Sequence, residues 1–262
     1  MQATDLDLLT DAARLAGRVA TSFVGKTAQS WDKPDGAGPV TEADLAVNTA
    51  LENVLRTARP EYGWLSEESE DTGARFQHET VFIIDPIDGT RSFVEGSRTW
   101  AHSIAIAHKG EVTAAAIFLP LRDKLYSAAR GRGAFHNGVR LSASDQRDLN
   151  TAEILATKPV MKTDHWPRGL PGFNRSHRPS LAYRLGLVAE ARFDGMLTFR
   201  PSWEWDIAAG ALIVTEAGGL CTDKTGAPLR FNNPEPLLNG VIAAGPALHA
   251  DVLQALAPTG MP

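Results

Sequence analysis

The stretch Val81-Phe82-Ile83-Ile84-Asp85-Pro86-Ile87-Asp88-Gly89-Thr90 is the most informative part of the chain. Its first four residues are apolar and mostly β-branched or aromatic, which predicts a short buried strand. We expect the strand to end at Asp85-Pro86 and to deliver two carboxylates, Asp85 and Asp88, at the edge of a sheet. The turn that follows can aim both carboxylates inward. Because Pro86 fixes φ and Gly89 lets the backbone approach a ligand closely, the amides near Gly89 and Thr90 can face an oxyanion. An ordinary Asp/Gly turn is the alternative interpretation.

Other acidic side chains stand at the ends of predicted elements. Glu67 lies in Ser66-Glu67-Glu68-Ser69, Asp206 in the first turn of an apolar helix, and Asp44 in the first turn of a helix that Thr41 caps. Each has a simple structural explanation, either a solvated acidic face or complementarity to a helix dipole. Their joint occurrence with Asp85 and Asp88, without a Cys/His set suited to zinc, favours Mg²⁺ or Mn²⁺.

The periodicity of the chain predicts alternating helices and strands. We expect helices at 4–23, 41–60, 180–191, 204–217 and 248–256, strands at 81–84, 103–107, 112–119, 153–156, 195–199 and 240–244, and a hairpin within 125–140. We divide the chain near Leu149 into an N-terminal half, 1–149, and a C-terminal half, 150–262, which form one compact unit with the active site between them. The predicted class is α+β.

Composition narrows the kind of protein. The 262 residues are 43% hydrophobic and 22% charged, as in ordinary folded domains. The net charge of −5 and the lack of a Lys/Arg-rich run argue against a nucleic-acid polymer or an anionic membrane as partner. A single cysteine, Cys221, permits no intrachain disulfide, and no signal peptide or membrane-length segment is visible. We therefore expect a cytoplasmic protein.

Two motifs and three supporting segments resemble the inositol monophosphatase superfamily, which includes inositol monophosphatases, histidinol-phosphate phosphatases and 3′(2′),5′-bisphosphate nucleotidases. The resemblance covers nearly the whole chain and implies a layered αβαβα sandwich. The first motif is 85–90 with Ser92-Phe93 following, the second is 205–210 with Glu216-Ala217-Gly218-Gly219 downstream, and the supporting segments are 40–44, 66–69 and 131–138.

The resemblance also implies a role for each site residue. The metal ligands would be Glu67, Asp85, the Ile87 carbonyl, Asp88 and Asp206, with Asp44 supporting a third, looser ion. The catalytic residues would be Asp44, Glu67 and Thr90. The residues that contact the phosphate or the rest of the substrate would be Gly89, Thr90, Lys33, Ser180 and Arg178. The cofactor would be two or three Mg²⁺ ions, with Mn²⁺ as a substitute, and lithium would inhibit. Two such ions, roughly 3.5 to 4 Å apart, clamp a phosphoryl group during hydrolysis.

The predicted function is a Mg²⁺-dependent phosphomonoesterase acting on a small phosphorylated metabolite. The Glu204-Trp205-Asp206 form of the second motif and Ser180-Leu181 resemble bisphosphate nucleotidases more than inositol phosphatases, and Lys33 matches the lysine that family members place before Asp44. This resemblance implies a 3′(2′),5′-bisphosphate nucleotide, such as adenosine 3′,5′-bisphosphate, as the favoured substrate. Inositol 1-phosphate and histidinol phosphate are the alternatives. Arg200 is either a contact to a second phosphate or a surface charge, and His102 is left out of the catalytic set. Resembling proteins are commonly homodimers.

Rival interpretations come from other classes. A haloacid-dehalogenase-type phosphatase places its two aspartates two residues apart so that one becomes a covalent nucleophile, whereas Asp85 and Asp88 are three apart. A metal-binding regulatory protein on the same fold is the non-enzyme alternative, although a protein without activity would more readily have lost a ligand. No twelve-residue calcium loop of the EF-hand kind is present.

Overall fold

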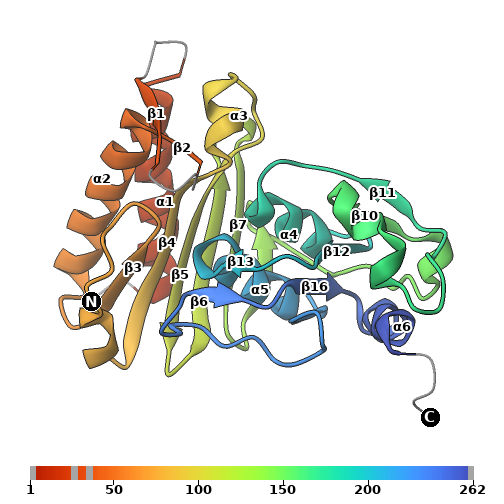
Figure 1. The fold of residues 1–262 in the computed structure, drawn as a ribbon. Helices are drawn as coiled ribbons and strands as arrows, with labels where there is room; N and C mark the ends of the chain where they lie inside the picture. The colour runs from red at the N-terminus through yellow and green to blue at the C-terminus, as the bar shows by residue number, and fades with distance from the viewer. Residues whose placement is uncertain (1–3, 25–28, 34–37, 259–262) are drawn as a thin grey trace.

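The computed structural model describes residues 4–24, 29–33 and 38–258 and shows five alternating layers of helix and sheet (Figure 1). Helices α1 and α2 form the first layer and a seven-stranded sheet the second. Helices α4 and α5 form the third layer, a five-stranded sheet the fourth, and α6 the last. The predicted α+β class and the αβαβα sandwich are confirmed.

Helices α1 (Asp5–Thr21) and α2 (Glu42–Ala58) begin where the sequence predicted. Thr4 caps α1 and Thr41 caps α2, and each threonine forms a reciprocal capping box with the aspartate three residues later. Both helices place an apolar stripe on the first face of the seven-stranded sheet, where it packs on residues such as Phe82 and Ile104. Asp44 is therefore held rigidly at the start of a docked helix.

The seven-stranded sheet has the order β3-β4-β5-β6-β7-β8-β9. Strand β3 is parallel to β4, and the remaining neighbours are antiparallel. The sequence analysis missed β3 and ended β4 too early. The strands are β3 (Gly63–Ser66), β4 (Thr80–Asp88), β5 (Ala101–His108), β6 (Glu111–Leu119), β7 (Lys124–Ala129), β8 (Gly133–His136) and β9 (Val139–Arg140).

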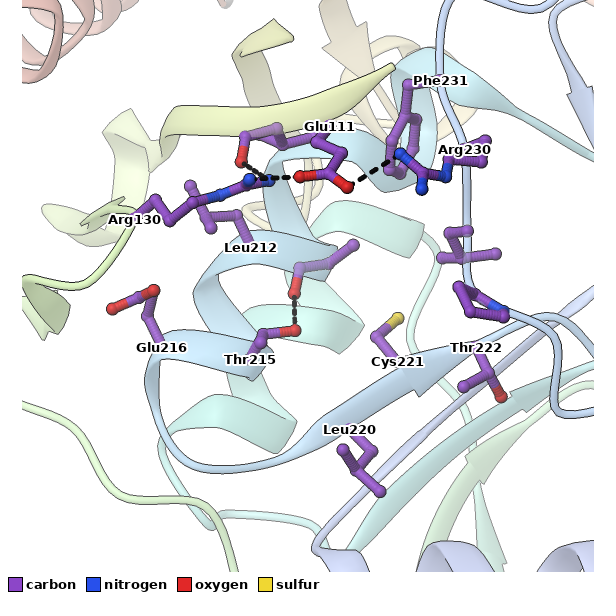
Figure 2. A pocket seen from close by; sticks show the side chains of 14 residues that line it. Glu111, Arg130, Leu212, Thr215, Glu216, Leu220, Cys221, Thr222, Arg230 and Phe231 are labelled. Atoms are coloured by element: carbon purple, nitrogen blue, oxygen red, sulfur yellow. Dashed lines mark hydrogen bonds and ion pairs between the residues drawn. The ribbon is translucent and has the colours of Figure 1, made fainter. Parts of the chain in front are cut away.

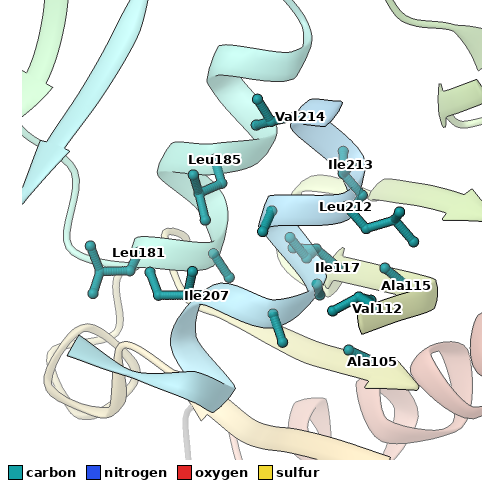
Figure 3. Packing of buried hydrophobic residues seen from close by; sticks show 14 of the residues in the cluster. Ala105, Val112, Ala115, Ile117, Leu181, Leu185, Ile207, Leu212, Ile213 and Val214 are labelled. Carbon is teal, nitrogen blue, oxygen red and sulfur yellow. The ribbon is translucent and has the colours of Figure 1, made fainter. Parts of the chain in front are cut away.

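The middle layer consists of α4 (Leu181–Ala189) and α5 (Glu204–Glu216), which cover the second face of this sheet (Figure 3). Both helices are apolar on nearly every side because sheets enclose them from two directions. They also approach each other closely: a Cβ added at Gly210 would lie 2.3 Å from Leu185 Cδ1. A larger residue at position 210 would push α5, and with it Asp206, away from α4.

The five-stranded sheet has the order β11-β10-β12-β16-β14, and α6 (Pro246–Leu256) packs on its outer face. Its strands are β10 (Glu153–Ala156), β11 (Asn174–Ser176), β12 (Gly195–Thr198), β14 (Leu220–Thr222) and β16 (Val241–Ala244). Two small pairs complete the fold: β1 (Ser30–Asp32) with β2 (Pro39–Thr41), and β13 (Ser202–Trp203) with β15 (Leu237–Leu238). The boundary near Leu149 stays a prediction. Among the described residues, no helix has the length and apolar character needed to cross a bilayer.

Candidate metal and phosphate site

A β-bulge in β4 brings the two aspartates of the first motif onto one face. Asp85 pairs with Ser103 and Asp88 pairs with Ala101, so three residue steps on β4 oppose two on β5. Without the extra residue, side chains three apart would point to opposite faces of the sheet. The strand does not end at Asp85-Pro86 as the sequence analysis expected, because it continues through the bulge to Asp88. Gly89, at φ 100°, then turns the chain into the short helix α3 (Thr90–Val94).

Asp206 joins these two aspartates from the first turn of α5. Carboxylate oxygens of Asp85, Asp88 and Asp206 all lie within 4.8 Å of one another. Asp85 is buried, and its Oδ1 has no hydrogen-bond partner among the described residues. Burial, together with the negative charges of Glu67, Asp88 and Asp206, raises the pKa of Asp85 well above its ordinary value. Burial and the charges of Asp88 and Glu67 raise the pKa of Asp206 in the same way.

This donor set fits a hard divalent cation. Carboxylate oxygens are the preferred ligands of Mg²⁺ and Mn²⁺, and Asp85 Oδ1 is a buried acceptor for which the described part of the chain supplies no donor. Three clustered carboxylates repel one another unless a cation or protons neutralise them. The residues present therefore fit the metal that the sequence analysis expected.

Asp88 is fixed by the start of α4. Its Oδ2 accepts from Ser180 Oγ at 2.6 Å and from the Ala182 backbone N–H at 2.6 Å. Ser180 is also the N-cap of α4, where its Oγ accepts from Tyr183 N at 2.9 Å. Burial raises the pKa of Asp88 to about 6, although these hydrogen bonds oppose the rise. Ser180, predicted as a substrate contact, thus binds a neighbouring carboxylate in this structure.

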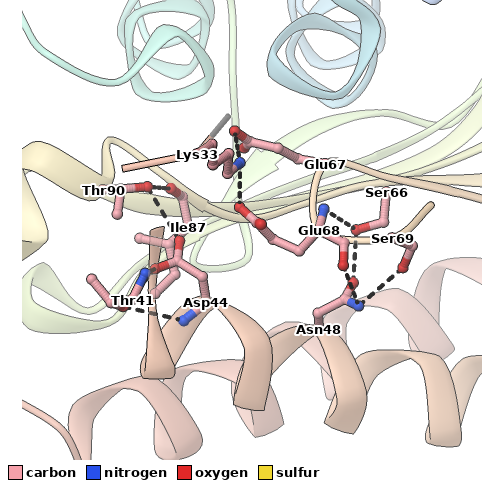
Figure 4. Close-up of polar contacts among 10 residues, drawn as sticks. All are labelled: Lys33, Thr41, Asp44, Asn48, Ser66, Glu67, Glu68, Ser69, Ile87 and Thr90. Atoms are coloured by element: carbon pink, nitrogen blue, oxygen red, sulfur yellow. Dashed lines mark hydrogen bonds and ion pairs between the residues drawn. The ribbon is translucent and has the colours of Figure 1, made fainter. Parts of the chain in front are cut away.

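A series of polar contacts links the start of α2 to the end of β4 (Figure 4). Asp44 Oδ2 accepts from the Thr41 N–H at 2.9 Å, and Asp44 Oδ1 lies 3.2 Å from the hydroxyl of Thr90. The same hydroxyl lies 3.2 Å from the Ile87 carbonyl oxygen. Burial raises the pKa of Asp44 to about 6. The structure thereby brings together Asp44, Ile87 and Thr90, as predicted from the sequence.

Lys33 lies against the acidic segment that follows β3 (Figure 4). Its Nζ is 2.7 Å from Glu67 Oε1 and 2.7 Å from Glu68 Oε1. Burial opposes the charge on Lys33, but the two glutamates raise its pKa overall. Burial also raises the pKa of Glu68 to about 7. The ammonium group of Lys33 therefore lies beside Glu67, whose negative charge raises the pKa of Asp85 and of Asp206.

Two arginines of the C-terminal half face the acidic cluster. Arg184 is a buried residue of α4, and its guanidinium donates to the carbonyl of Pro179 and contacts the ring of His177. Burial lowers the pKa of Arg184 to about 10, and the negative charges of Asp88 and Asp206 oppose this shift. Arg200 lies within electrostatic range of Arg184 and Asp206. The sequence analysis missed Arg184, although a charged residue in the apolar run Leu181–Ala189 was a visible signal.

Arg178 contacts other parts of the chain. Its guanidinium carbon is 5.4 Å from the centre of the Phe193 ring, and its Nη1 donates to the His177 carbonyl at 2.7 Å. It lines a basic cavity of about 260 Å³ together with Arg122, Lys124 and Arg192. Its role as a phosphate contact stays a prediction.

A buried network fixes the start of α5. Glu204 is fully buried, and its carboxylate accepts from the backbone N–H groups of Asn232 at 2.6 Å and Asn233 at 2.9 Å. Arg75, also buried, donates to Asn232 Oδ1 at 2.5 Å and to the Asn233 carbonyl at 2.8 Å. Because Glu204 is two residues before Asp206, this network connects the segment after Glu67 with the helix that carries Asp206.

We expect Glu204→Gln to lower the free energy of unfolding by about 2 kcal/mol, because hydrogen bonds to a charged group contribute about 1.5–3 kcal/mol. Chemical denaturation at pH 7 measures the effect. Glu235→Gln is the matched control, since Glu235 is exposed in the same loop and should change stability by less than about 0.5 kcal/mol. Equal effects of the two substitutions would contradict the network's role.

A cavity of about 550 Å³ is lined by a separate set of residues (Figure 2). Apolar side chains such as Leu212, Leu220 and Phe231 line it. At its rim Glu111 forms ion pairs with Arg130 and Arg230. None of the residues predicted for the metal site lines this cavity, so the acidic cluster, not this cavity, is the candidate functional site.

Comparisons with known proteins agree with this geometry. The model of the inositol monophosphatase family matches residues 1–259. An inositol-1-monophosphatase of Rhizobium meliloti is 36% identical over 222 residues, covering 79% of this chain and 77% of that protein. The Nus factor SuhB of Pseudomonas aeruginosa is 35% identical over 254 residues, covering 92% and 90%.

Solved structures give the same picture. The extragenic suppressor protein suhB of Bartonella henselae superposes with a TM-score of 0.82 at 30% identity, covering 97% of this chain and 98% of that one. An IMPase of Thermotoga maritima superposes with a TM-score of 0.81 at 27% identity, covering 96% of each chain.

Proposed function

The chain belongs to the inositol monophosphatase family, and from this premise we propose that it is a Mg²⁺-dependent phosphomonoesterase for a small phosphorylated metabolite. The observation that carries the proposal is the cluster of Asp85, Asp88 and Asp206 oxygens within 4.8 Å of one another. Asp206 is more than a hundred residues from the other two in the chain, and one buried oxygen of the cluster, Asp85 Oδ1, has no donor among the described residues. A divalent cation would neutralise such a cluster.

We assign two or three Mg²⁺ ions to the site, with Mn²⁺ as a substitute. Their ligands would be Glu67, Asp85, Asp88, Asp206 and the Ile87 carbonyl, with Asp44 supporting the third ion. When bound, such ions supply a water of lowered pKa and neutralise charge on the leaving oxygen.

The chain's own groups would orient the reactants. The Thr90 hydroxyl lies between Asp44 and the Ile87 carbonyl, at 3.2 Å from each, so its lone pairs can accept a hydrogen bond from the attacking water. Asp44, which that hydroxyl contacts, would help to hold the same water. The N–H groups of Gly89 and Thr90 follow Asp88 at the turn into α3 and would donate to phosphoryl oxygens. Lys33 would add a positive charge beside Glu67.

For the substrate we propose a 3′(2′),5′-bisphosphate nucleotide. Arg200 supports it, because its side chain is exposed and its charge lies within electrostatic range of Asp206. Guanidinium groups bind phosphate through paired N–H donors. A monophosphate has no second phosphate for Arg200 once its single phosphoryl group occupies the metal site.

A substrate panel tests the proposal. We expect kcat/KM for adenosine 3′,5′-bisphosphate to exceed the values for inositol 1-phosphate and histidinol phosphate by at least about tenfold, since a charged hydrogen bond contributes about 1.5–3 kcal/mol. Steady-state phosphate release at saturating Mg²⁺, repeated with rising Li⁺, gives the ranking and the lithium response. A higher value for either monophosphate would replace the substrate assignment and leave the phosphatase assignment intact.

A regulatory role is the second candidate, because relatives that are 34–35% identical are named Nus factors. Such a protein would keep the fold and its metal site without turnover. Absence of phosphate release from every substrate in the panel would favour this candidate.

A further inference from the structure

Trp203 is an exposed aromatic residue close in the chain to the acidic cluster. It is the second residue of β13 and the N-cap of α5, three residues before Asp206. Its side chain is 41% exposed, although tryptophan is usually well buried. A large apolar surface therefore lies at the start of the helix that carries Asp206 into the candidate metal site.

The ring of Trp203 is held in place from below. It stacks on Trp205 with ring centres 4.8 Å apart and planes 9° from parallel. Trp205 is itself anchored, because it is buried and its carbonyl accepts from Ser103 Oγ on β5 at 2.8 Å. Pairing of Trp203 with Leu237 in β15 fixes the backbone. One face of Trp203 is thus covered by Trp205, and the exposed remainder forms a rigid planar surface.

Arg200 supplies a positive charge close to Trp203 in the chain. Arg200 is three residues before Trp203 in the chain, and its charge reaches Asp206 and Arg184. A ligand that matched these groups would combine a planar ring, for Trp203, with a second anionic group, for the exposed Arg200. A nucleotide has both features, whereas inositol and glycerol phosphates have no planar ring.

We propose that Trp203 is the stacking surface for the base of the substrate and so selects phosphate esters whose leaving alcohol carries a nucleobase. The inference rests on the proposed function and adds the residue that recognises the nucleoside. Stacking on an aromatic side chain is tolerant of base identity, because every base has a π-face. Trp203 therefore separates nucleotides from non-aromatic esters and does not separate adenine from other bases.

Trp203 also covers Trp205, so a purely structural role must be distinguished. Trp203→Ala removes the surface, Trp203→Leu keeps apolar cover without a plane, and Trp203→Phe keeps a smaller plane. Each variant is assayed with adenosine 3′,5′-bisphosphate and with the matched sugar bisphosphate that lacks a base. Thermal unfolding of each variant reports any loss of the cover over Trp205.

We expect Trp203→Ala and Trp203→Leu to raise KM for the nucleotide about tenfold and to leave kcat within about twofold. The base-free substrate should keep its KM, and Trp203→Phe should restore most of the nucleotide affinity. Equal changes for both substrates, or recovery by leucine as complete as by phenylalanine, would overturn the inference.

The proposed function can fail separately. If wild-type protein releases phosphate from neither substrate, the phosphatase assignment is wrong, and equilibrium dialysis of the nucleotide against each variant still decides the role of Trp203. Weaker binding to Trp203→Ala than to wild type would then support the stacking surface, and equal binding would overturn it.

Discussion

Asp206→Asn is expected to lower kcat/KM at least about a thousandfold, because metal ions contribute several kcal/mol of transition-state stabilisation and each 1.4 kcal/mol corresponds to a factor of ten. Asn offers one neutral oxygen where Asp offers a charged carboxylate. The pKa of Asp206 is raised by burial and by its acidic neighbours, so removing its charge also removes repulsion within the cluster. We therefore expect the variant to fold and to lack turnover, as measured by phosphate release across a range of Mg²⁺ concentrations.

Asp145→Asn is the matched control for this substitution. Asp145 is exposed in the segment between β9 and β10, far in sequence from the site residues. The same change there should leave kcat/KM within about twofold, as is usual for surface substitutions. Turnover near the wild-type level in Asp206→Asn would remove Asp206 from the metal site.

The layered fold could be predicted largely because its helices carry strong local signals. Thr4 and Thr41 each precede an aspartate at the capping-box spacing, and both caps are present in the structure. The apolar run at 81–84 predicted a central strand, which the structure extends to Thr80–Asp88. Strand β3 was missed for two reasons. Its four residues alternate little in polarity and so give no period-two signal, and the strand that it pairs with, β4, lies in a later segment of the chain.

The site could be predicted only in part. The acidic residues were identifiable by type, and the motif resemblance assigned them together. The bulge in β4 was not predicted: the sequence analysis let both aspartates face inward through a turn after the strand, whereas the structure places them on one face by a bulge within the strand. Likewise Arg75 and Glu204 meet through Asn232 and Asn233, which are more than a hundred and fifty residues from Arg75.

Long-range contacts also explain one supporting motif. The glycines at 131 and 133 have φ of 71° and 84°, and their N–H groups donate to Glu216 Oε1 and Oε2 at 2.7 Å each. The carboxylate therefore binds the turn as an anion binds a nest of N–H groups. Two segments that the sequence analysis quoted separately are thus parts of one contact at the far end of α5.

A divalent metal ion at a concentration a hundred times its dissociation constant is expected to stabilise the folded protein by about 2.7 kcal/mol. This stabilisation should raise the melting temperature by about 5 °C. The carboxyls of Asp44 and Asp88 have an ordinary pKa of 3.8 that burial raises to about 6. The folded metal-free chain thus binds more protons than the unfolded chain between these values, so its stability falls as pH rises from about 4 to 6. Bound Mg²⁺ replaces those protons, so the gain should be larger at pH 7 than at pH 5.

Differential scanning fluorimetry with MgCl₂, with EDTA, and with NaCl at equal ionic strength measures this gain. The informative comparison is again Asp206→Asn. Because one repelling charge is gone, its metal-free form should melt no lower than metal-free wild type. Because one ligand is gone, Mg²⁺ should shift its melting temperature little or not at all. Equal Mg²⁺-induced shifts of the melting temperature in both proteins would mean that the ion binds elsewhere. If Mg²⁺ did not shift the melting temperature of wild type, the proposal that the acidic cluster binds a divalent cation would be wrong.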